Sequence, residues 1–175
     1  MDEPMPDTYF KIMSFLMKFR DLFSPRKNVL SEVGMKPGFH VLDYGCGPGS
    51  YVPISSELVG KKGKVYALDI QPLAIKRVTK MALKKNLTNV QTIQSDCKTG
   101  LPDNEIDVAL LYDIFHLLSE PDKILAEIHR VLKPNGILSV NDHHLEDDEI
   151  ICGITKQGMF SLKEKGNKTI NFLIR

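Results

Sequence analysis

Residues 41–50 (VLDYGCGPGS) constrain the fold more than any other part of the sequence. Glycines at 45, 47 and 49 directly follow a short hydrophobic run, and Asp43 lies two residues before the first of them. Glycine lets the backbone approach a ligand closely and opens the N-terminus of the next helix to it. The dinucleotide fingerprint is G-x-G-x-x-G, whereas here Gly49 comes one residue early and Ser50 takes the third-glycine place. The run therefore predicts a ligand-binding turn between a strand and a helix, and it argues against a nicotinamide-dependent oxidoreductase.

Short apolar runs and helix-like stretches alternate from residue 39 onward. Strands are predicted at 40–44, 64–69, 89–94, 106–112 and 137–140, and helices at 51–59, 72–85, 121–132 and 147–157, with a turn at 133–136. This alternation favours a parallel sheet with helices on both faces. Residues 159–162 and 169–174 flank a Gly-Asn turn and predict an antiparallel hairpin. In the 72–85 helix the residues expected to face the core are Ile75, Val78, Met81, Ala82 and Leu83.

The N-terminal region reads as helical. Residues 8–23 have a wide apolar side that includes Phe10, Met13, Phe15, Leu16, Met17, Phe19, Leu22 and Phe23. Ser24 and Pro25 then suit an N-cap and first-turn proline for a short helix at 26–33, which ends at Gly34. We expect one domain over residues 1–175, with 1–34 as a helical cap and 35–175 as the ligand-binding core. Phe10, Met13 and Met17 are hypothesised to close the site.

Composition narrows the class of protein. The net charge of +1 gives no bulk attraction to nucleic acid or an anionic membrane, although it leaves room for a local patch. Lysines and arginines at 61, 62, 64, 76, 77, 80, 84 and 85 are candidates for such a basic face, or for an ordinary solvated helix exterior. Three cysteines without CxxC spacing indicate neither a zinc site nor a disulfide framework, so reduced thiols in a cytoplasmic protein are expected. No secretory signal or membrane-spanning run is found.

The stretch DYGCGPG resembles the cofactor-binding loop of class I S-adenosylmethionine-dependent methyltransferases, and the likeness continues in order from about residue 30 to 142. Asp69 closes the second strand, where the family's carboxylate accepts hydrogen bonds from the ribose hydroxyls. Residues 94–97 match the segment that meets the adenine. The resemblance implies a Rossmann-like, doubly wound, seven-stranded α/β sheet of order 3-2-1-4-5-7-6 with strand 7 antiparallel. The cofactor-binding residues that it implies are Asp43, Gly45, Cys46, Gly47, Gly49, Asp69, Ile70, Asp96, Cys97 and Tyr112.

Candidates for acid–base chemistry follow the fourth and fifth strands. His116 and His143 are the predicted catalytic residues, since histidine titrates near neutral pH. Catechol-type methyltransferases bind Mg²⁺ near such positions, but Asn141-Asp142 reverses the usual order, so no metal is expected. The Asp/Asn-Pro-Pro-Tyr run of relatives that methylate amino groups of nucleobases or glutamine is missing after the fourth strand.

The overall pattern looks most like the small methyltransferases of ubiquinone and menaquinone biosynthesis. The resemblance implies methyl transfer from S-adenosylmethionine to a small-molecule acceptor. From composition and hydropathy we expect a cytoplasmic protein with no nucleic-acid partner and no membrane span, and we expect a monomer or homodimer. Two alternatives remain open: a non-catalytic S-adenosylmethionine-binding module, and a methyltransferase acting on protein or RNA.

Overall fold

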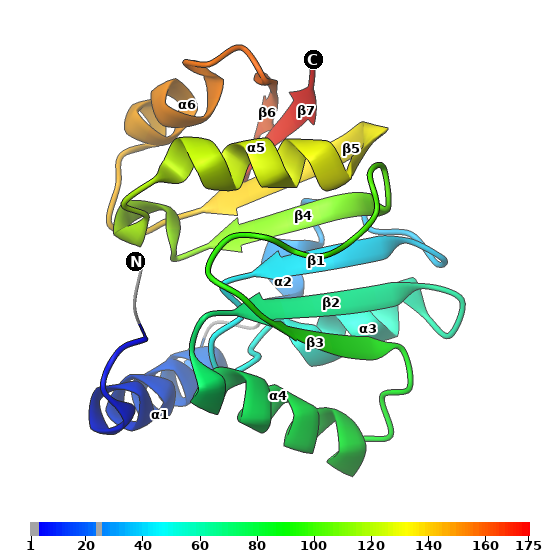
Figure 1. Ribbon diagram of the computed structural model, residues 1–175, viewed down its shortest axis with the longest axis vertical. Helices are drawn as coiled ribbons and strands as arrows, with labels where there is room; N and C mark the ends of the chain where they lie inside the picture. Colours follow the sequence, from blue (N-terminus) through cyan, green and yellow to red (C-terminus); the bar gives the residue numbers. More distant parts are fainter. Residues whose placement is uncertain (1–3, 24–25) are drawn as a thin grey trace.

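The computed structural model describes residues 4–23 and 26–175, and for Lys18 and residues 21–23 it describes the backbone alone (Figure 1). The cap predicted at Ser24 and Pro25, and the predicted packing of Leu22 and Phe23, therefore lie outside what is described. The rest of the chain forms one central sheet with helices on both faces (Figure 1).

The sheet has the order β3-β2-β1-β4-β5-β7-β6. Its strands are β1 (His40–Tyr44), β2 (Lys64–Asp69), β3 (Val90–Gln94), β4 (Ile106–Tyr112), β5 (Leu132–Asn141), β6 (Phe160–Lys165) and β7 (Ile170–Ile174). The strands from β3 to β5 pair in parallel, and β7 runs antiparallel to both of its neighbours. The predicted order and the antiparallel seventh strand are confirmed.

The helices divide between the two faces. They are α1 (Asp7–Phe23), α2 (Arg26–Leu30), α3 (Val52–Val59), α4 (Pro72–Lys84), α5 (Pro121–Val131) and α6 (Asp147–Thr155), with a short 3₁₀ turn η1 (Phe115–Leu117). Apolar residues of α2, α3 and α4 pack with one face of the sheet, and those of α5 and α6 pack with the other. Because side chains alternate along a strand, Leu42 and Val41 of β1 enter opposite clusters.

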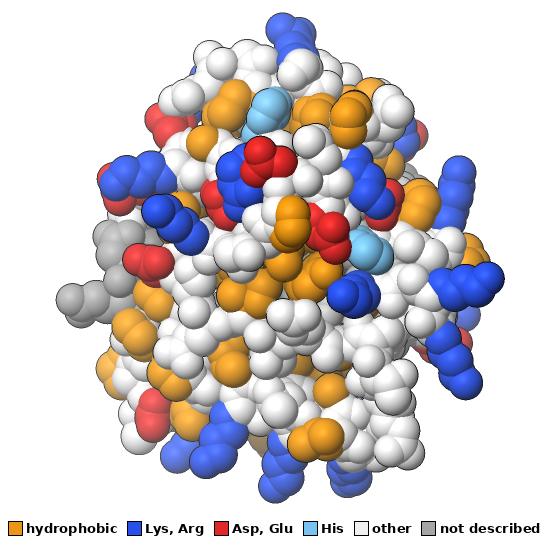
Figure 2. All heavy atoms as spheres, turned by 45° about the vertical axis from the view of Figure 1, so that its right-hand side comes forward, with side chains coloured by type: hydrophobic (Ala, Val, Ile, Leu, Met, Phe, Trp, Pro, Cys, Tyr) orange, Lys and Arg blue, Asp and Glu red, His pale blue; other side chains and the backbone are white. Residues whose placement is uncertain are grey.

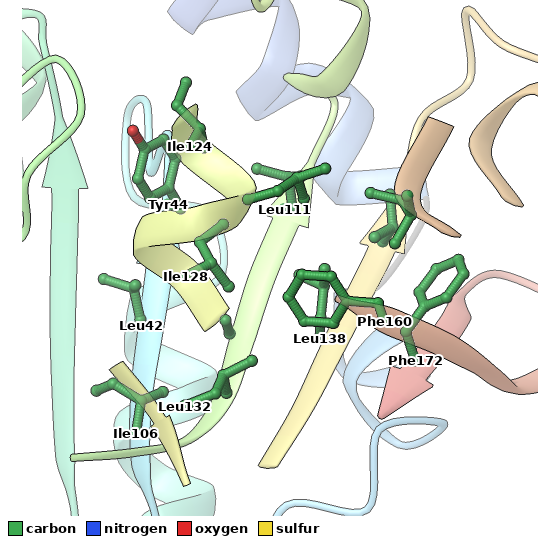
Figure 3. Packing of buried hydrophobic residues seen from close by; sticks show 14 of the residues in the cluster. Leu42, Tyr44, Ile106, Leu111, Ile124, Ile128, Leu132, Leu138, Phe160 and Phe172 are labelled. Atoms are coloured by element: carbon green, nitrogen blue, oxygen red, sulfur yellow. The ribbon is translucent and has the colours of Figure 1, made fainter. Parts of the chain in front are cut away.

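The larger cluster shows why α5 forms where it does. Ile124, Leu125, Ile128 and Val131 recur at helical spacing and are all buried. Figure 3 shows Ile124 and Ile128 of α5 lying over Leu42 and Tyr44 of β1, with Phe160 and Phe172 of the terminal hairpin extending the same core. The hairpin therefore continues the hydrophobic core past β5.

Two predictions about single elements need correction. The turn predicted at 133–136 lies inside a longer β5, because Leu132 already pairs with Ile106 and the register then moves by two residues on β4 and five on β5. Leu83 was expected in the core but is 74% exposed, because it lies on the solvent side of α4. The buried residues of this helix are Ala74, Val78 and Ala82. Leu83 sits one residue past the buried Ala82, and a single step turns a helix by about 100°.

Candidate cofactor and acceptor site

A pocket lies at the carboxyl ends of the parallel strands, next to the point where the chain order reverses between β1 and β4. Open α/β sheets bind ligands at such a switch point. α1 covers the pocket from one side, as the predicted lid would. The lining residues are Met5, Phe10, Met13, Met17, Tyr44, Gly45, Gly47, Leu68, Asp69, Ile70, Gln71, Ser95, Asp96, Tyr112, Asp113, Ile114, Leu117 and Leu118.

The glycine loop is held by β2. The Gly45 and Cys46 amides donate to the Leu68 carbonyl at 2.8 and 2.9 Å. The Gly47 amide donates to Asp69 Oδ2 at 2.7 Å, and the Gln71 amide donates to Asp69 Oδ1 at 2.8 Å. Burial raises the pKa of Asp69, and these amide donors act against that rise. Asp69 thus ties the loop to the start of α4.

Gly49 is required for close packing. Its φ is +85°, in the left-handed region, and a Cβ there would lie 2.9 Å from both Val78 and Met81 of α4. Gly47 also has a positive φ, but a Cβ there would meet nothing within 4 Å. The loop therefore presses against α4 at Gly49 and leaves space at Gly47, where it borders the pocket.

Asp43 is a buried carboxyl group in an unusual position. It is 2% exposed, and its Oδ2 has no hydrogen-bond partner among the described residues. Burial and the nearby charge of Asp69 raise its pKa from 3.8 to about 7. The amides of Gly45, Cys46 and Gly47 donate to Leu68 and Asp69 and not to Asp43.

At the far end of the pocket, β1 meets the segment after β3. The Tyr44 hydroxyl donates to the carbonyls of Asp96 and Cys97 at 3.1 and 3.4 Å. The Cys97 amide donates to Ser95 Oγ at 3.3 Å. Tyr44 was not predicted as a site residue, because nothing local in D-Y-G shows which distant carbonyls its hydroxyl will reach.

Acids and histidines gather where β4 and β5 end. Asp113, with φ +54°, lines the pocket and contacts Arg20 Nη1 of α1 at 2.8 Å and His143 Nδ1 at 2.6 Å. Burial alone would raise the pKa of Asp113, but these two hydrogen bonds hold it below its usual value. His116 Nδ1 lies 2.8 Å from Asp142 Oδ2, whose side chain is fully buried. The rings of His116, His144 and His143 follow one another at centroid distances of 4.2 and 4.0 Å.

Six of the predicted cofactor residues line the pocket: Gly45, Gly47, Asp69, Ile70, Asp96 and Tyr112. The other four do not line it, although each is close in sequence to a residue that does: Asp43 precedes Tyr44 on β1, Cys46 lies between Gly45 and Gly47, Gly49 lies two residues after Gly47, and Cys97 follows Asp96. Of the two predicted catalytic histidines neither lines the pocket, but His143 contacts Asp113, which does. Missed residues include Gln71, whose Nε2 donates to the Met5 carbonyl at 3.1 Å beside the start of α1.

No group of three or more His, Cys, Asp or Glu residues among the described ones is placed to hold a metal ion. Within residues 4–23 and 26–175, no helix combines the length and the apolar character needed to cross a membrane.

Several known proteins are similar to this chain in sequence and in fold. A family model described as "Methyltransferase domain" matches residues 35–171. A demethylmenaquinone methyltransferase of Geobacillus stearothermophilus is 32% identical over 132 residues, which cover 74% of this chain and 56% of that protein. The ubiquinone/menaquinone biosynthesis C-methyltransferase UbiE of a Shewanella strain is 31% identical over 144 residues, covering 81% and 57%. The chain thus spans little more than half the length of these relatives.

A solved structure matches over nearly its whole length. A SAM-dependent methyltransferase from Aquifex aeolicus superimposes with a TM-score of 0.79 and 30% identity, covering 91% of this chain and 98% of that one. Together with the family match over residues 35–171, this similarity shows that the chain belongs to the S-adenosylmethionine-dependent methyltransferase family.

Proposed function

We propose that this protein transfers the methyl group of S-adenosylmethionine, the cofactor of its family, to an apolar small-molecule acceptor. One observation carries the proposal: the pocket has two unlike sides. Polar groups of the strand ends, including Asp69 and Asp96, line one side, and Phe10, Met13 and Met17 of α1 line the other. A nucleoside needs hydrogen-bond acceptors, whereas an apolar acceptor suits the second wall.

The residues present fit the cofactor. Asp69 accepts from the Gly47 and Gln71 amides, one on each oxygen, and the Ile70 amide also acts on it. A carboxylate has about four acceptor positions, so Asp69 can still accept from the ribose. We assign the adenine to Asp96 and the Cys97 backbone, flanked by Ile70. We assign the methionine half to the glycine loop and Tyr112, with the unpartnered Asp43 carboxylate stabilising its cationic amino group.

Methyl transfer depends mainly on alignment and on excluding water. When bound, S-adenosylmethionine supplies an electrophilic methyl group on a sulfonium. The apolar side chains of α1 would exclude water above it, as the predicted lid requires. Gln71 supports this closed arrangement through its hydrogen bond to the Met5 carbonyl.

An acceptor that loses a proton needs a base near the pocket. We propose the pair Asp113–His143, because Asp113 lies in the pocket wall and holds His143 Nδ1 at 2.6 Å. The carboxylate would fix the ring's orientation and stabilise the imidazolium that forms. His116 stays a predicted catalytic residue, bound to Asp142 and outside the pocket lining.

The relatives suggest where to look for the acceptor. The name of the first gives demethylmenaquinone as its substrate, and the name of the second gives C-methylation in ubiquinone and menaquinone biosynthesis. We therefore propose a reduced, ring-bearing quinone precursor as the first acceptor to test. The cytoplasmic location and the monomeric or homodimeric state stay predictions.

Calorimetric titration with S-adenosylhomocysteine, with NADH in parallel, tests the cofactor assignment. Micromolar binding of the first ligand alone is expected. No binding of S-adenosylhomocysteine by folded protein would refute the proposal. Transfer of labelled methyl to demethylmenaquinol would support the acceptor class, whereas cofactor binding without turnover across an acceptor screen would favour the non-catalytic binding module.

A further inference from the structure

One end of the molecule carries an uncommon set of exposed side chains. Eight large hydrophobic side chains are exposed among the described residues, and six of them lie on just two helices, α1 and α4. Both helices lie at the lower end of the molecule in Figure 1. Their starts are joined by the hydrogen bond from Gln71, the N-cap of α4, to the carbonyl of Met5.

The exposed residues of α1 form one continuous face. Each of Tyr9, Ile12, Phe15, Leu16 and Phe19 lies three or four residues from at least one other of the set, which places them on one side of the helix. Phe15 is 70% exposed. The opposite side of the same helix carries Phe10, Met13 and Met17 into the pocket. α1 is thus apolar on two sides, and the lid function uses only one of them.

α4 adds positive charge beside this face. Its sequence contains Lys76, Arg77, Lys80 and Lys84 and no acidic residue. Lys76, Lys80 and Lys84 recur every four residues, are exposed, and pair with no described acidic residue. Leu83, 74% exposed, lies among them. Figure 2 shows basic and hydrophobic side chains gathered at this lower end.

We infer that the outer faces of α1 and α4 bind the surface of an anionic lipid bilayer. An anionic bilayer surface suits both features. Its acyl-chain region can take up the apolar face of α1, and its negative headgroups can pair with the row of lysines on α4. A folded protein partner would need the apolar face but not the uncompensated lysines, and RNA would need the lysines but not five exposed apolar side chains. The bound protein would lie on the membrane without crossing it.

The inference does not depend on methyl transfer, so binding is measured without turnover. The full chain is floated with vesicles of phosphatidylcholine alone and of phosphatidylcholine mixed with phosphatidylglycerol. We expect binding to the mixed vesicles, weakening as salt is raised. Equal binding to both vesicle types, or to neither, overturns the inference.

Paired variants separate the two contributions. Phe15→Ser with Leu16→Ser should lower vesicle binding at least about tenfold, whereas Leu162→Ser, an exposed leucine on β6, should not. Lys76→Glu with Lys80→Glu should lower it roughly thirtyfold. Lys163→Glu with Lys168→Glu makes the same change in net charge on the β6–β7 hairpin, at the opposite edge of the sheet from β3 and α4, and should leave binding nearly unchanged. S-adenosylhomocysteine binding serves as the folding control for every variant.

Light scattering distinguishes the other occupant, a second copy of the chain. Loss of a dimer in the Phe15 and Leu16 variant, without any vesicle binding by the parent protein, would assign the face to self-association and refute the lipid surface.

Discussion

Replacing Asp43 by asparagine should stabilise the ligand-free protein and lower its affinity for the cofactor. The carboxyl group is 2% exposed, has an oxygen without a partner among the described residues, and lies near the negative charge of Asp69. Its ionised form is therefore disfavoured in the folded state. Asparagine has almost the same shape and no charge, so it removes the penalty.

The pKa of Asp43 gives the direction and the size of its effect on the stability of the folded protein. The pKa of Asp43 rises from 3.8 in the unfolded chain to about 7 in the folded one, so the folded state holds its proton more tightly. Stability is then highest below pH 4 and is lost as pH rises toward 7. The rise in the pKa of Asp43 corresponds to at most roughly 4 kcal/mol of lost stability. Structural relaxation and the cost of burying the new amide reduce the stabilisation expected from Asp43→Asn to about 2–3 kcal/mol.

Thermal unfolding at pH 5 and pH 8 measures the effect. At pH 8 we expect Asp43→Asn to raise the Tm by about 5–10 °C, because 1 kcal/mol shifts a chain of this size by roughly 2–4 °C. At pH 5 the gain should be less than half as large, because stability starts to fall above pH 3.8 and most of the fall occurs between pH 5 and about 7. Calorimetry with S-adenosylhomocysteine should show weaker binding by the variant at pH 8. A Tm gain of the same size at both pH values would refute the reasoning about Asp43.

Three further changes test other parts of the site and fold. Asp69→Ala should weaken S-adenosylhomocysteine binding by ~1–3 kcal/mol, since it removes a charged acceptor; unchanged affinity in calorimetry would contradict the ribose assignment. Gly49→Ala should lower the free energy of unfolding in urea by ~1–3 kcal/mol more than Gly38→Ala, because both have positive φ but only Gly49 is crowded. Glu127 accepts from Thr99 and Arg130, and despite burial these bonds lower its pKa to about 2. Its stabilising effect should therefore be lost as pH falls from 4.5 toward 2, and Glu127→Gln should abolish that acid dependence.

Much of the architecture was predictable because its signals are local. The bounds of β1, β2 and β4 follow from short apolar runs that end at glycine or acidic residues, and those three predictions match the structure. The glycine loop was recognisable for the same reason. Predicted boundaries were wrong where pairing with a distant strand sets the end of an element. β5, for example, extends back to Leu132 because Leu132 pairs with Ile106 of β4.

The candidate site was only half predictable. Residues at strand ends, such as Asp69 and Asp96, could be placed from order along the chain, since parallel strands end at one edge of the sheet. Tyr44 and Gln71 could not, because their roles come from contacts with backbone atoms 52 and 66 residues away. Arg20 is a clearer case: it reaches Asp113 across 93 residues of sequence.

The sequence by itself determined the order of strands and helices, the position of the glycine turn and the family, because periodicity and turn chemistry act over a few neighbouring residues. Only the tertiary structure decided which groups share a low-dielectric environment. Asp43 and Asp113 are both aspartates at strand ends, yet the pKa of Asp43 is raised and that of Asp113 is lowered. The difference arises because folding brings Arg20 and His143 to Asp113, whereas it buries Asp43 near the carboxylate of Asp69.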